Sequence, residues 1–562
     1  MSTHRISTGS AALILALAGS ALAQESGMVA MHTDKDLRET TRQGQLSPKL
    51  HNLGKHSRKT STTNPQAQKY FDQGLVLAYA FNHAEAVRSF KEAQRLDPEC
   101  ALAYWGEAYA LGPNINAPMD ESAVSPAWDA VQKAIAKKPA ATEVERAMID
   151  ALATRYSPDP KADRAALDKA YAGAMQGLAK RYPTDADILS IAAESVMDTD
   201  PWNYWTNDGN PRPYTRDVIA LIEKAIALNA DHPLALHLHI HALEASQEAD
   251  RAVTSGERLL NVAPGAGHLV HMPSHIFFRV GRYNEAAAAN LKAIAVDEDY
   301  ITQCKAQGIY PAAYYPHNVH FLWIAYSHEG RSADAITAAK KTASKPHPDM
   351  AAGLQQFIVA PYHAMVRFAK WDEALAAPRP ADNLPFVLAT WHWARGMALA
   401  NTRKLDEAES ELANLKSVAA RPDFPHTLIL VNSPPPRLMQ IAERLLTGEI
   451  ALARRDTDEA ITHFSAAARL EDSTTYNEPP DWPTATRHWL ADALLDAKRP
   501  VEAEAVLLED LRRRPRNGWA LFGLVQAIKA QGTGRETDLA QAESRWKTAW
   551  PTADVKLHSA RW

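Results

Sequence analysis

Apolar residues recur at intervals of three and four along most of the chain, which is the spacing of one face of an α-helix. Ala, Leu and Glu dominate, β-branched residues are sparse, and no alternating strand pattern persists. In the stretch 67–98, two helical segments meet at a short turn near His83. The pattern therefore predicts an all-α protein of helix-turn-helix units. Residues 24–65 are polar instead, and we expect them to form a flexible N-terminal arm.

Small and aromatic residues recur at fixed places within these units. In 67–98 the anchors are Gly74, Ala86, Phe90, Ala93 and Pro98, and later copies repeat the alanine of Ala86 at Ala286, Ala335, Ala408, Ala460 and Ala503. Small side chains let neighbouring helices approach closely, so that the apolar residues between them interlock. The pattern resembles the tetratricopeptide repeat, a helix pair of about 34 residues. The resemblance implies a solenoid of antiparallel helix pairs that forms a superhelix with a concave groove.

Longer segments narrow the resemblance. "YFDQGLVLAYAFNHAEAVRSF", "GAGHLVHMPSHIFFRVGRY" and "YYPHNVHFLWIAY" are similar to a group of exported bacterial tetratricopeptide-repeat proteins, over residues 52–525. This similarity implies a fold and a compartment more than an activity. The predicted organisation is a signal peptide (1–23), the arm (24–65), N-terminal repeats with insertions (66–232), His-rich central repeats (233–370) and C-terminal repeats (371–562).

The N-terminus has the features of a secretory signal peptide. Arg5 precedes an apolar run, and Ala21-Leu22-Ala23 forms a cleavage motif. The run is short for a bilayer span, and no later stretch has about 18 unbroken apolar residues. We therefore expect a periplasmic or secreted protein without a membrane span. The 61 basic and 66 acidic residues give a net charge of −5, which argues against a nucleic-acid-binding protein.

Histidines are concentrated in the middle of the chain, in "HLHIHALE" (237–244), "HLVHMPSH" (268–275) and "HNVH" (317–320). In the tetratricopeptide family, one stripe of the first helix of each repeat lines the groove. Counted from repeat starts at Pro233, Gly267 and Pro316, the predicted groove-lining metal ligands are His237, His241, His268, His271, His275, His317 and His320. His363 falls on the same stripe of the next repeat, whereas His239 should face the interior.

Two of these sets have the spacing of a chelating pair. His237 and His241, like His271 and His275, are four residues apart and so point to the same side of a helix. Imidazoles bind metals at about 2.0–2.1 Å, and packed helices lie roughly 8–10 Å apart, so pairs on adjacent helices can share an ion. The predicted cofactor is a transition-metal ion; imidazole suits copper, zinc, iron and nickel.

Cysteines do not supply an alternative metal site. Cys100 and Cys304 are the only two in the chain, too few for an all-cysteine zinc site. The sequence leaves open whether they pair with each other, because pairing depends on the geometry of the fold.

Nearby carboxylates would give such a site catalytic chemistry. Glu244 is one turn beyond His241, and Glu194 precedes this region; either would assist a metal-activated water or oxygen, in an oxidoreductase or a hydrolase. The first hypothesis is therefore that the groove binds a metal ion, for metal binding or metal-dependent chemistry, with a small molecule or peptide as a further partner. The alternative is an interaction scaffold that binds a peptide, protein or glycan without metal. The sequence leaves open whether the protein is an enzyme.

Overall fold

The computed structural model describes residues 44–304, 310–427 and 429–562, and these residues form helices and turns with no strand beyond two isolated bridges. The predicted all-α fold is therefore confirmed. The chain divides into two compact units: unit 1 comprises residues up to Ile276 together with Lys292–Tyr315, and unit 2 comprises Phe277–Leu291 and Pro316–Trp562. The predicted division into three repeat regions stays a prediction.

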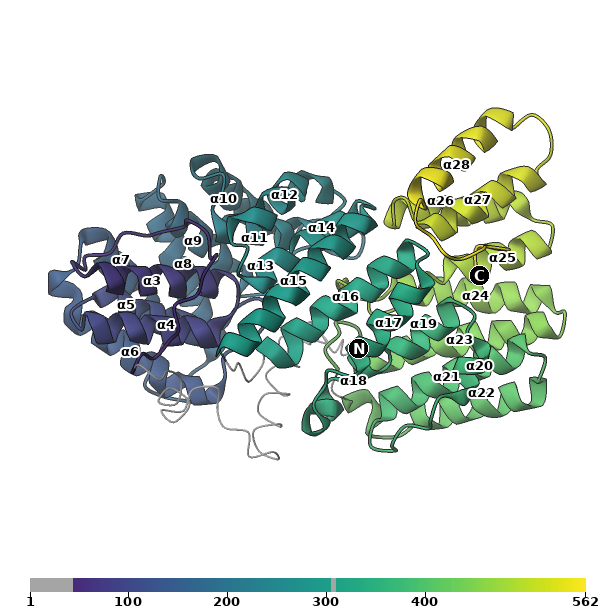
Figure 1. Ribbon diagram of the computed structural model, residues 1–562, viewed down its shortest axis with the longest axis horizontal. Coiled ribbons are helices and arrows are strands. Elements are labelled where there is room, and N and C mark those ends of the chain that lie inside the picture. Colours follow the sequence, from purple (N-terminus) through teal and green to yellow (C-terminus); the bar gives the residue numbers. More distant parts are fainter. Residues whose placement is uncertain (1–43, 305–309, 428) are drawn as a thin grey trace, which may run out of the picture. The chain divides into compact units, whose positions relative to one another are not determined.

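The helices of unit 1 are α3 (Pro65–Tyr79), α4 (His83–Leu96), α5 (Ala101–Leu111), α6 (Val124–Lys137), α7 (Glu143–Ala153), α8 (Arg164–Arg181), α9 (Ala186–Met197), α10 (Thr215–Leu228), α11 (Pro233–Leu243), α12 (Val253–Val262) and α13 (Gly267–His271) (Figure 1). Two unit boundaries fall inside α14 (Pro273–Arg279) and α15 (Tyr283–Cys304), and the third follows the first residue of α16 (Tyr315–His328).

The helices of unit 2 are α16 (Tyr315–His328), α17 (Ser332–Ala343), α18 (Gln355–Ile358), α19 (Ala360–Arg367), α20 (Trp371–Ala376), α21 (Pro385–Asn401), α22 (Leu405–Ala419), α23 (Pro435–Ala453), α24 (Thr457–Asp472), α25 (Arg487–Asp496), α26 (Pro500–Arg513), α27 (Gly518–Ala530) and α28 (Glu536–Ala549). Within each unit, helices adjacent in sequence pack on one another, as α3 does on α4 and α21 on α22.

One turn recurs between the two helices of a pair. After α3, Phe81 has a φ of 56°, and the N–H of Asn82 donates to the carbonyl of Leu77 at 2.9 Å. This is the Schellman cap, in which a left-handed residue ends a helix. The same left-handed position and the same hydrogen bond occur at Gly281, Gly330, Ala369, Arg403, Arg455 and Lys498. The cap occurs at Phe81 in unit 1 and at the other six positions in unit 2, and its recurrence agrees with the predicted helix pairs.

The predicted anchors Gly74 and Phe90 pack as their sizes require, and Gly448 and Phe464 form the corresponding pair on α23 and α24. A Cβ placed on Gly74 would lie 2.8 Å from the ring of Phe90, and one on Gly448 would lie 2.4 Å from the ring of Phe464. Phe90, Ala86 and Phe464 are fully buried. Glycine therefore allows the first helix of a pair to rest directly on the aromatic ring of the second.

Part of the predicted arm is held on unit 1. Ser47 donates to Glu85 at 2.7 Å, and the N–H of Gly265 donates to the carbonyl of Asn52 at 2.7 Å. Arg58 pairs with Asp185 and Asp187 at 2.9 and 3.1 Å. At these three points the segment 44–64 is held on unit 1. The predicted signal peptide (1–23) and the rest of the arm lie outside the described residues.

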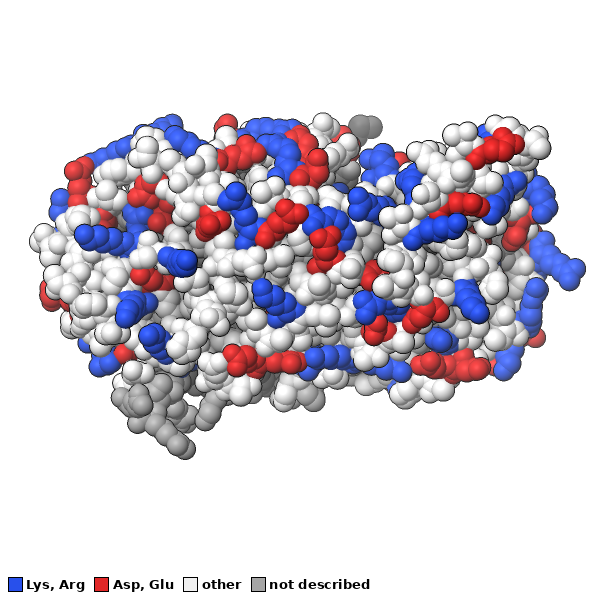
Figure 2. Space-filling view, turned by 45° about the horizontal axis from the view of Figure 1, so that its top comes forward, with Lys and Arg blue, Asp and Glu red and all other residues white. Residues whose placement is uncertain are grey.

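Among the described residues, no helix combines the length and apolar character needed to cross a bilayer. Cys100 and Cys304 are both buried free thiols. On the face drawn in Figure 2, basic and acidic side chains of the described residues are interspersed.

Candidate metal centre

Two helices of unit 1 bring three histidines together. His237 and His241 stand one turn apart on α11, which begins at Pro233 with the side chain of His232 as its N-cap. His268 is near the start of α13. Each of the three offers a ring nitrogen, and these nitrogens all lie within 4.8 Å of one another. The i,i+4 spacing found in the sequence accounts for the position of His237 relative to His241.

A close backbone approach positions His268. The N–H of His268 donates to the hydroxyl of Tyr310 at 3.1 Å, and that hydroxyl donates to Asp297 at 2.9 Å. A Cβ on Gly267 would lie only 1.8 Å from the carboxylate of Asp297, so any larger residue would displace that carboxylate. Gly267 thereby lets α13 begin against Asp297 and fixes where its first imidazole lies.

Hydrogen bonds define which nitrogen two of these rings offer. Nδ1 of His237 lies 2.8 Å from the carbonyl oxygen of Tyr79, and Nδ1 of His241 lies 2.7 Å from Oε1 of Glu244. Since a carbonyl and a carboxylate only accept, each Nδ1 carries the proton and each Nε2 keeps its lone pair. Among the described residues, neither Nε2 has a hydrogen-bond partner, and both ring nitrogens of His268 also lack one.

Burial keeps this three-histidine cluster (His237, His241 and His268) neutral. The three side chains are at most 2% exposed. Burial lowers the pKa of all three imidazoles. The neighbouring imidazoles lower the pKa values of His237 and His268 further, to well below the usual range of a histidine. A neutral imidazole is the form that binds a metal. The cluster is enclosed, whereas the sequence pattern predicted an open groove.

Aromatic residues enclose the cluster. The ring of Phe81 lies 4.5 Å from that of His237 and 5.5 Å from that of His268, between ring centroids. Trp202 packs edge-on against His241 at 5.1 Å, and Tyr314 against His268 at 5.0 Å. Trp202 itself has a φ of 63°, a left-handed backbone that a large side chain rarely adopts. Phe81 and Trp202 come from turns between helices, and Tyr314 ends a short π-helix (Tyr310–Tyr314) directly before α16. Helix spacing alone therefore did not predict the enclosure.

Glu244 lies behind the imidazoles. Its Oε1 accepts from His241, and its Oε2 accepts from Nδ1 of His275 at 2.6 Å. Nε2 of His275 in turn lies 2.8 Å from Nε2 of His271. Burial alone raises the pKa of Glu244, but His275 and His241 outweigh it and lower the pKa to about 2. An ionised Glu244 therefore positions two histidines through their Nδ1 atoms; a catalytic role for it stays a prediction.

The helix that carries His271 and His275 is interrupted at Met272, directly before Pro273, and resumes as α14. The pair nevertheless stays on one side, as its Nε2–Nε2 contact requires. Proline lacks an N–H and so interrupts the hydrogen bonds of a helix. The interruption here leaves His271 and His275 on the same side.

Glu194, the second predicted catalytic carboxylate, is on α9. It accepts a hydrogen bond from the hydroxyl of Tyr109 and is 3% exposed. Burial and then the charge of Asp198 raise its pKa to about 8. Glu194 does not belong to the group of ligand atoms that meet at the three-histidine cluster.

His317 and His320 are on α16, in unit 2. The ring of His317 packs edge-on against Phe321, and that of His320 against Phe357. Burial lowers the pKa of His320 to about 3. Their role as metal ligands stays a prediction.

A second cluster in unit 1 was not predicted. Nε2 of both His56 and His232 lies 3.1 Å from Oδ1 of Asp187, and the hydroxyl of Tyr79 donates to the same oxygen at 2.7 Å. Arg58 also pairs with Asp187, and its positive charge disfavours a cation here. No sequence spacing links residues this far apart, so the cluster was out of reach of the sequence argument.

Comparison with known proteins adds little. No protein-family model and no curated protein matches the chain. Among solved structures, a chain of the APC/C hetero-tetramer Cut9–Hcn1 is 16% identical over 86% of this chain and 74% of its own, with a TM-score of 0.30. Human IFIT1, solved as a dimer with PPP-AAAA, is 14% identical over 88% and 92%, with a TM-score of 0.31. The P58(IPK) TPR domain is 13% identical over 83% and 98%, with a TM-score of 0.22. Likeness at this level carries no functional argument.

Proposed function

We propose that this protein binds a transition-metal ion through Nε2 of His237, Nε2 of His241 and one ring nitrogen of His268. One observation carries the proposal: three neutral, buried imidazoles share a small space, and these nitrogens have no other partner among the described residues. A buried polar atom without a partner costs about 1–3 kcal/mol, and an ion would remove that cost at several atoms at once.

The residues fit such an ion. Tetrahedral bonds of about 2.0–2.1 Å place ligand nitrogens roughly 3.4 Å apart, so the present limit of 4.8 Å requires only a small contraction of the cluster. Metal-binding histidines usually donate their other N–H to a carbonyl or a carboxylate, as His237 does to Tyr79 and His241 to Glu244. An all-imidazole set suits zinc, copper, iron and nickel and disfavours magnesium or calcium.

A metal-dependent reaction is a second candidate, favoured by the number of ligands. Three protein nitrogens leave one tetrahedral position for water or substrate, as in catalytic rather than structural zinc sites. When bound, the ion would supply Lewis acidity to a ligand in that position. The rings of Phe81 and Trp202 would keep the surroundings apolar.

The experiment uses full-length protein purified without a histidine tag. We expect about one equivalent of metal by elemental analysis, and Co²⁺ titration should give the visible absorption of a tetrahedral site. His237→Gln and His241→Gln should abolish both signals. His239→Gln is the matched control, because His239 lies on the same helix but bonds Ser255 at 2.8 Å. Retention of metal by folded His241→Gln protein would refute the proposal.

We also propose that the protein is exported, which matters because the compartment determines which metal ions are present around it. Export is supported by Arg5, the apolar run and the cleavage motif at Ala21-Leu22-Ala23. N-terminal sequencing of the protein recovered from a two-membrane host should begin at Gln24. An intact N-terminus on protein that stays in the cytoplasm would contradict export and leave metal binding untouched.

A further inference from the structure

A second set of buried polar groups lies in unit 2, on one face of α19. His363 and Arg367 are four residues apart on this helix, and both side chains are at most 4% exposed. Nδ1 of His363 and Nη2 of Arg367 have no hydrogen-bond partner among the described residues. The spacing places both unsatisfied groups on the same side of the helix.

Arg367 is an arginine without a carboxylate. Its guanidinium carbon lies 3.3 Å from the ring centroid of Trp519, and Nη1 donates to Nδ1 of His488 at 3.3 Å. No described Asp or Glu forms an ion pair with it. Burial lowers the pKa of Arg367 well below its usual range, which means that the surrounding protein stabilises its charge poorly. A buried cation of this kind is normally paired with an anion.

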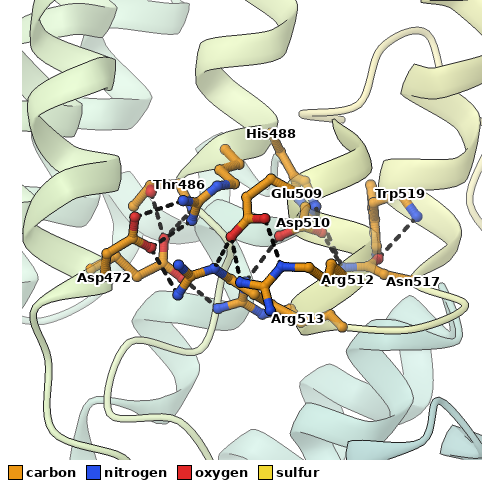
Figure 3. A network of polar contacts seen from close by, with 12 residues as sticks. Asp472, Thr486, His488, Glu509, Asp510, Arg512, Arg513, Asn517 and Trp519 are labelled. Atoms are coloured by element: carbon orange, nitrogen blue, oxygen red, sulfur yellow. Dashed lines mark hydrogen bonds and ion pairs between the residues drawn. The ribbon is translucent and has the colours of Figure 1, made fainter. Parts of the chain in front are cut away.

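The polar groups next to Arg367 already form hydrogen bonds with other residues. His488 donates from Nε2 to Oδ2 of Asp510 at 3.2 Å, and Oδ1 of Asp510 accepts from Arg514 at 2.9 Å. Figure 3 shows His488, Asp510, Asn517 and Trp519 within one dense polar network. Asp510 therefore accepts hydrogen bonds from His488 and Arg514, and its charge acts on Arg367 without an ion pair or hydrogen bond between them. The network fixes the guanidinium but leaves its Nη2 edge unsatisfied.

Aromatic N–H groups surround His363. Its ring lies 5.0 Å from both Trp393 and Trp482, and the two indoles lie 5.1 Å from each other, between centroids. Both indole Nε1 atoms are buried and lack a hydrogen-bond partner among the described residues, as does Nε2 of Gln356 on α18. An indole Nε1 only donates, and so does an amide nitrogen. The unsatisfied atoms here are thus mainly donors, accompanied by one positive charge.

We propose that unit 2 binds a small organic carboxylate at this face of α19. One carboxylate oxygen pairs with Nη2 of Arg367, and the indole N–H groups of Trp393 and Trp482 hold the other, beside the ring of His363. An acceptor-rich anion satisfies the unpartnered N–H groups of Arg367, Trp393 and Trp482, whereas a cation or an apolar ligand satisfies none of these three. Indole faces add a surface for an apolar or aromatic body. Enclosure of all four side chains favours a free small acid over the C-terminal carboxylate of a peptide.

Calorimetry and thermal shift on the full-length protein test this site. The probes are acetate, benzoate, benzamide as the uncharged analogue of benzoate, and a short peptide with a free or amidated C-terminus. We expect benzoate to bind and benzamide to bind at least 10-fold more weakly. Binding of the free-acid peptide but not of its amide would assign the carboxylate to a chain end instead. If no carboxylate binds, water satisfies these donors and the proposal is overturned.

Variants separate the site from general stability. Arg367→Met should weaken benzoate binding at least 10-fold, and Arg367→Lys should restore part of it. Arg395→Met is the matched control, because Arg395 also stacks on an indole, at 4.8 Å from Trp391, but already pairs with Glu411 at 2.9 Å. If Arg367→Met does not fold, Trp393→Phe and Trp482→Phe keep an aromatic ring but remove the N–H donor together with part of the indole, and each should weaken binding several-fold. Unchanged binding in these variants would place the ligand elsewhere.

Discussion

His241 donates a hydrogen bond from Nδ1 to Oε1 of Glu244 at 2.7 Å, and this contact determines which nitrogen the ring presents to the three-histidine cluster. The other oxygen of Glu244 holds His275 in the same way, at 2.6 Å. One carboxylate on the turn after α11 therefore orients imidazoles from two helices. Each oxygen of Glu244 accepts a hydrogen bond from one imidazole. The neutral side chain of the same shape, glutamine, has an oxygen at only one of these two positions.

Glu244→Gln should accordingly weaken metal binding by about 10- to 100-fold. The amide oxygen of glutamine accepts from only one imidazole, and its NH₂ group faces the N–H of the other. Competition with a chromogenic chelator measures the change in affinity. Glu223→Gln is the control, since Glu223 on α10 also lies beside a histidine of α11, at 3.6 Å from His239, which is not part of the three-histidine cluster. Equal affinities for the two variants would mean that Glu244 has no part in positioning the ligands.

Sequence and structure agree where the determinants are local. Gly74 and Phe90 predicted the close packing of a helix pair, and the spacing of His237 and His241 predicted a pair on one side of α11. Local periodicity fixes such relationships because the helix itself sets the geometry.

Relationships between repeats were not predictable in this way. His363 was placed on the groove stripe, but its neighbours Trp393 and Trp482 come from α21 and from the loop before α25. The aromatic cover of the three-histidine cluster likewise comes from turns such as that of Phe81. The pattern of one helix carries no information about which loop will cover it.

Metal should stabilise the folded protein by mass action. At free metal one hundred times the dissociation constant, a site absent from the unfolded chain adds about 2.7 kcal/mol to the free energy of unfolding. We expect a higher Tm with Zn²⁺ or Cu²⁺ by scanning calorimetry, reversed by EDTA. The increase should vanish in His237→Gln protein and persist in His239→Gln. If added metal does not change the Tm of the wild-type protein, the result would count against an internal metal site.

Two glycines of unit 1 should respond to alanine in opposite directions. Gly74→Ala places a methyl 2.8 Å from the buried ring of Phe90, and such overpacking costs about 1–3 kcal/mol. Gly177 lies in the exposed part of α8, where an added Cβ meets nothing within 4 Å. Alanine there should stabilise by up to about 1 kcal/mol, since it favours the helix over glycine. Urea unfolding measures both; equal effects would contradict the close packing of α3 on α4.

Stability should fall as pH rises because of Glu194. Its burial, and then the neighbouring charge of Asp198, raise its pKa to about 8, against about 4.3 in an unfolded chain. Between these values the folded protein keeps a proton that the unfolded chain has lost. The folded state is therefore favoured most at the acidic end of this window, and each pH unit above it removes at most about 1.4 kcal/mol.

Glu194→Gln should flatten this decline between about pH 5 and pH 8. Glutamine is uncharged throughout, and its oxygen still accepts from the hydroxyl of Tyr109, as Glu194 does. Urea unfolding at several pH values measures the slope. Some slope should remain, because burial also raises the pKa of Asp198, to about 7, against the pull of Arg155. Glu143→Gln, on the exposed surface of α7, should run parallel to the wild type. If Glu194→Gln also ran parallel, Glu194 would be ionised in the folded protein, and a proton-transfer role at neutral pH would lose its physical basis.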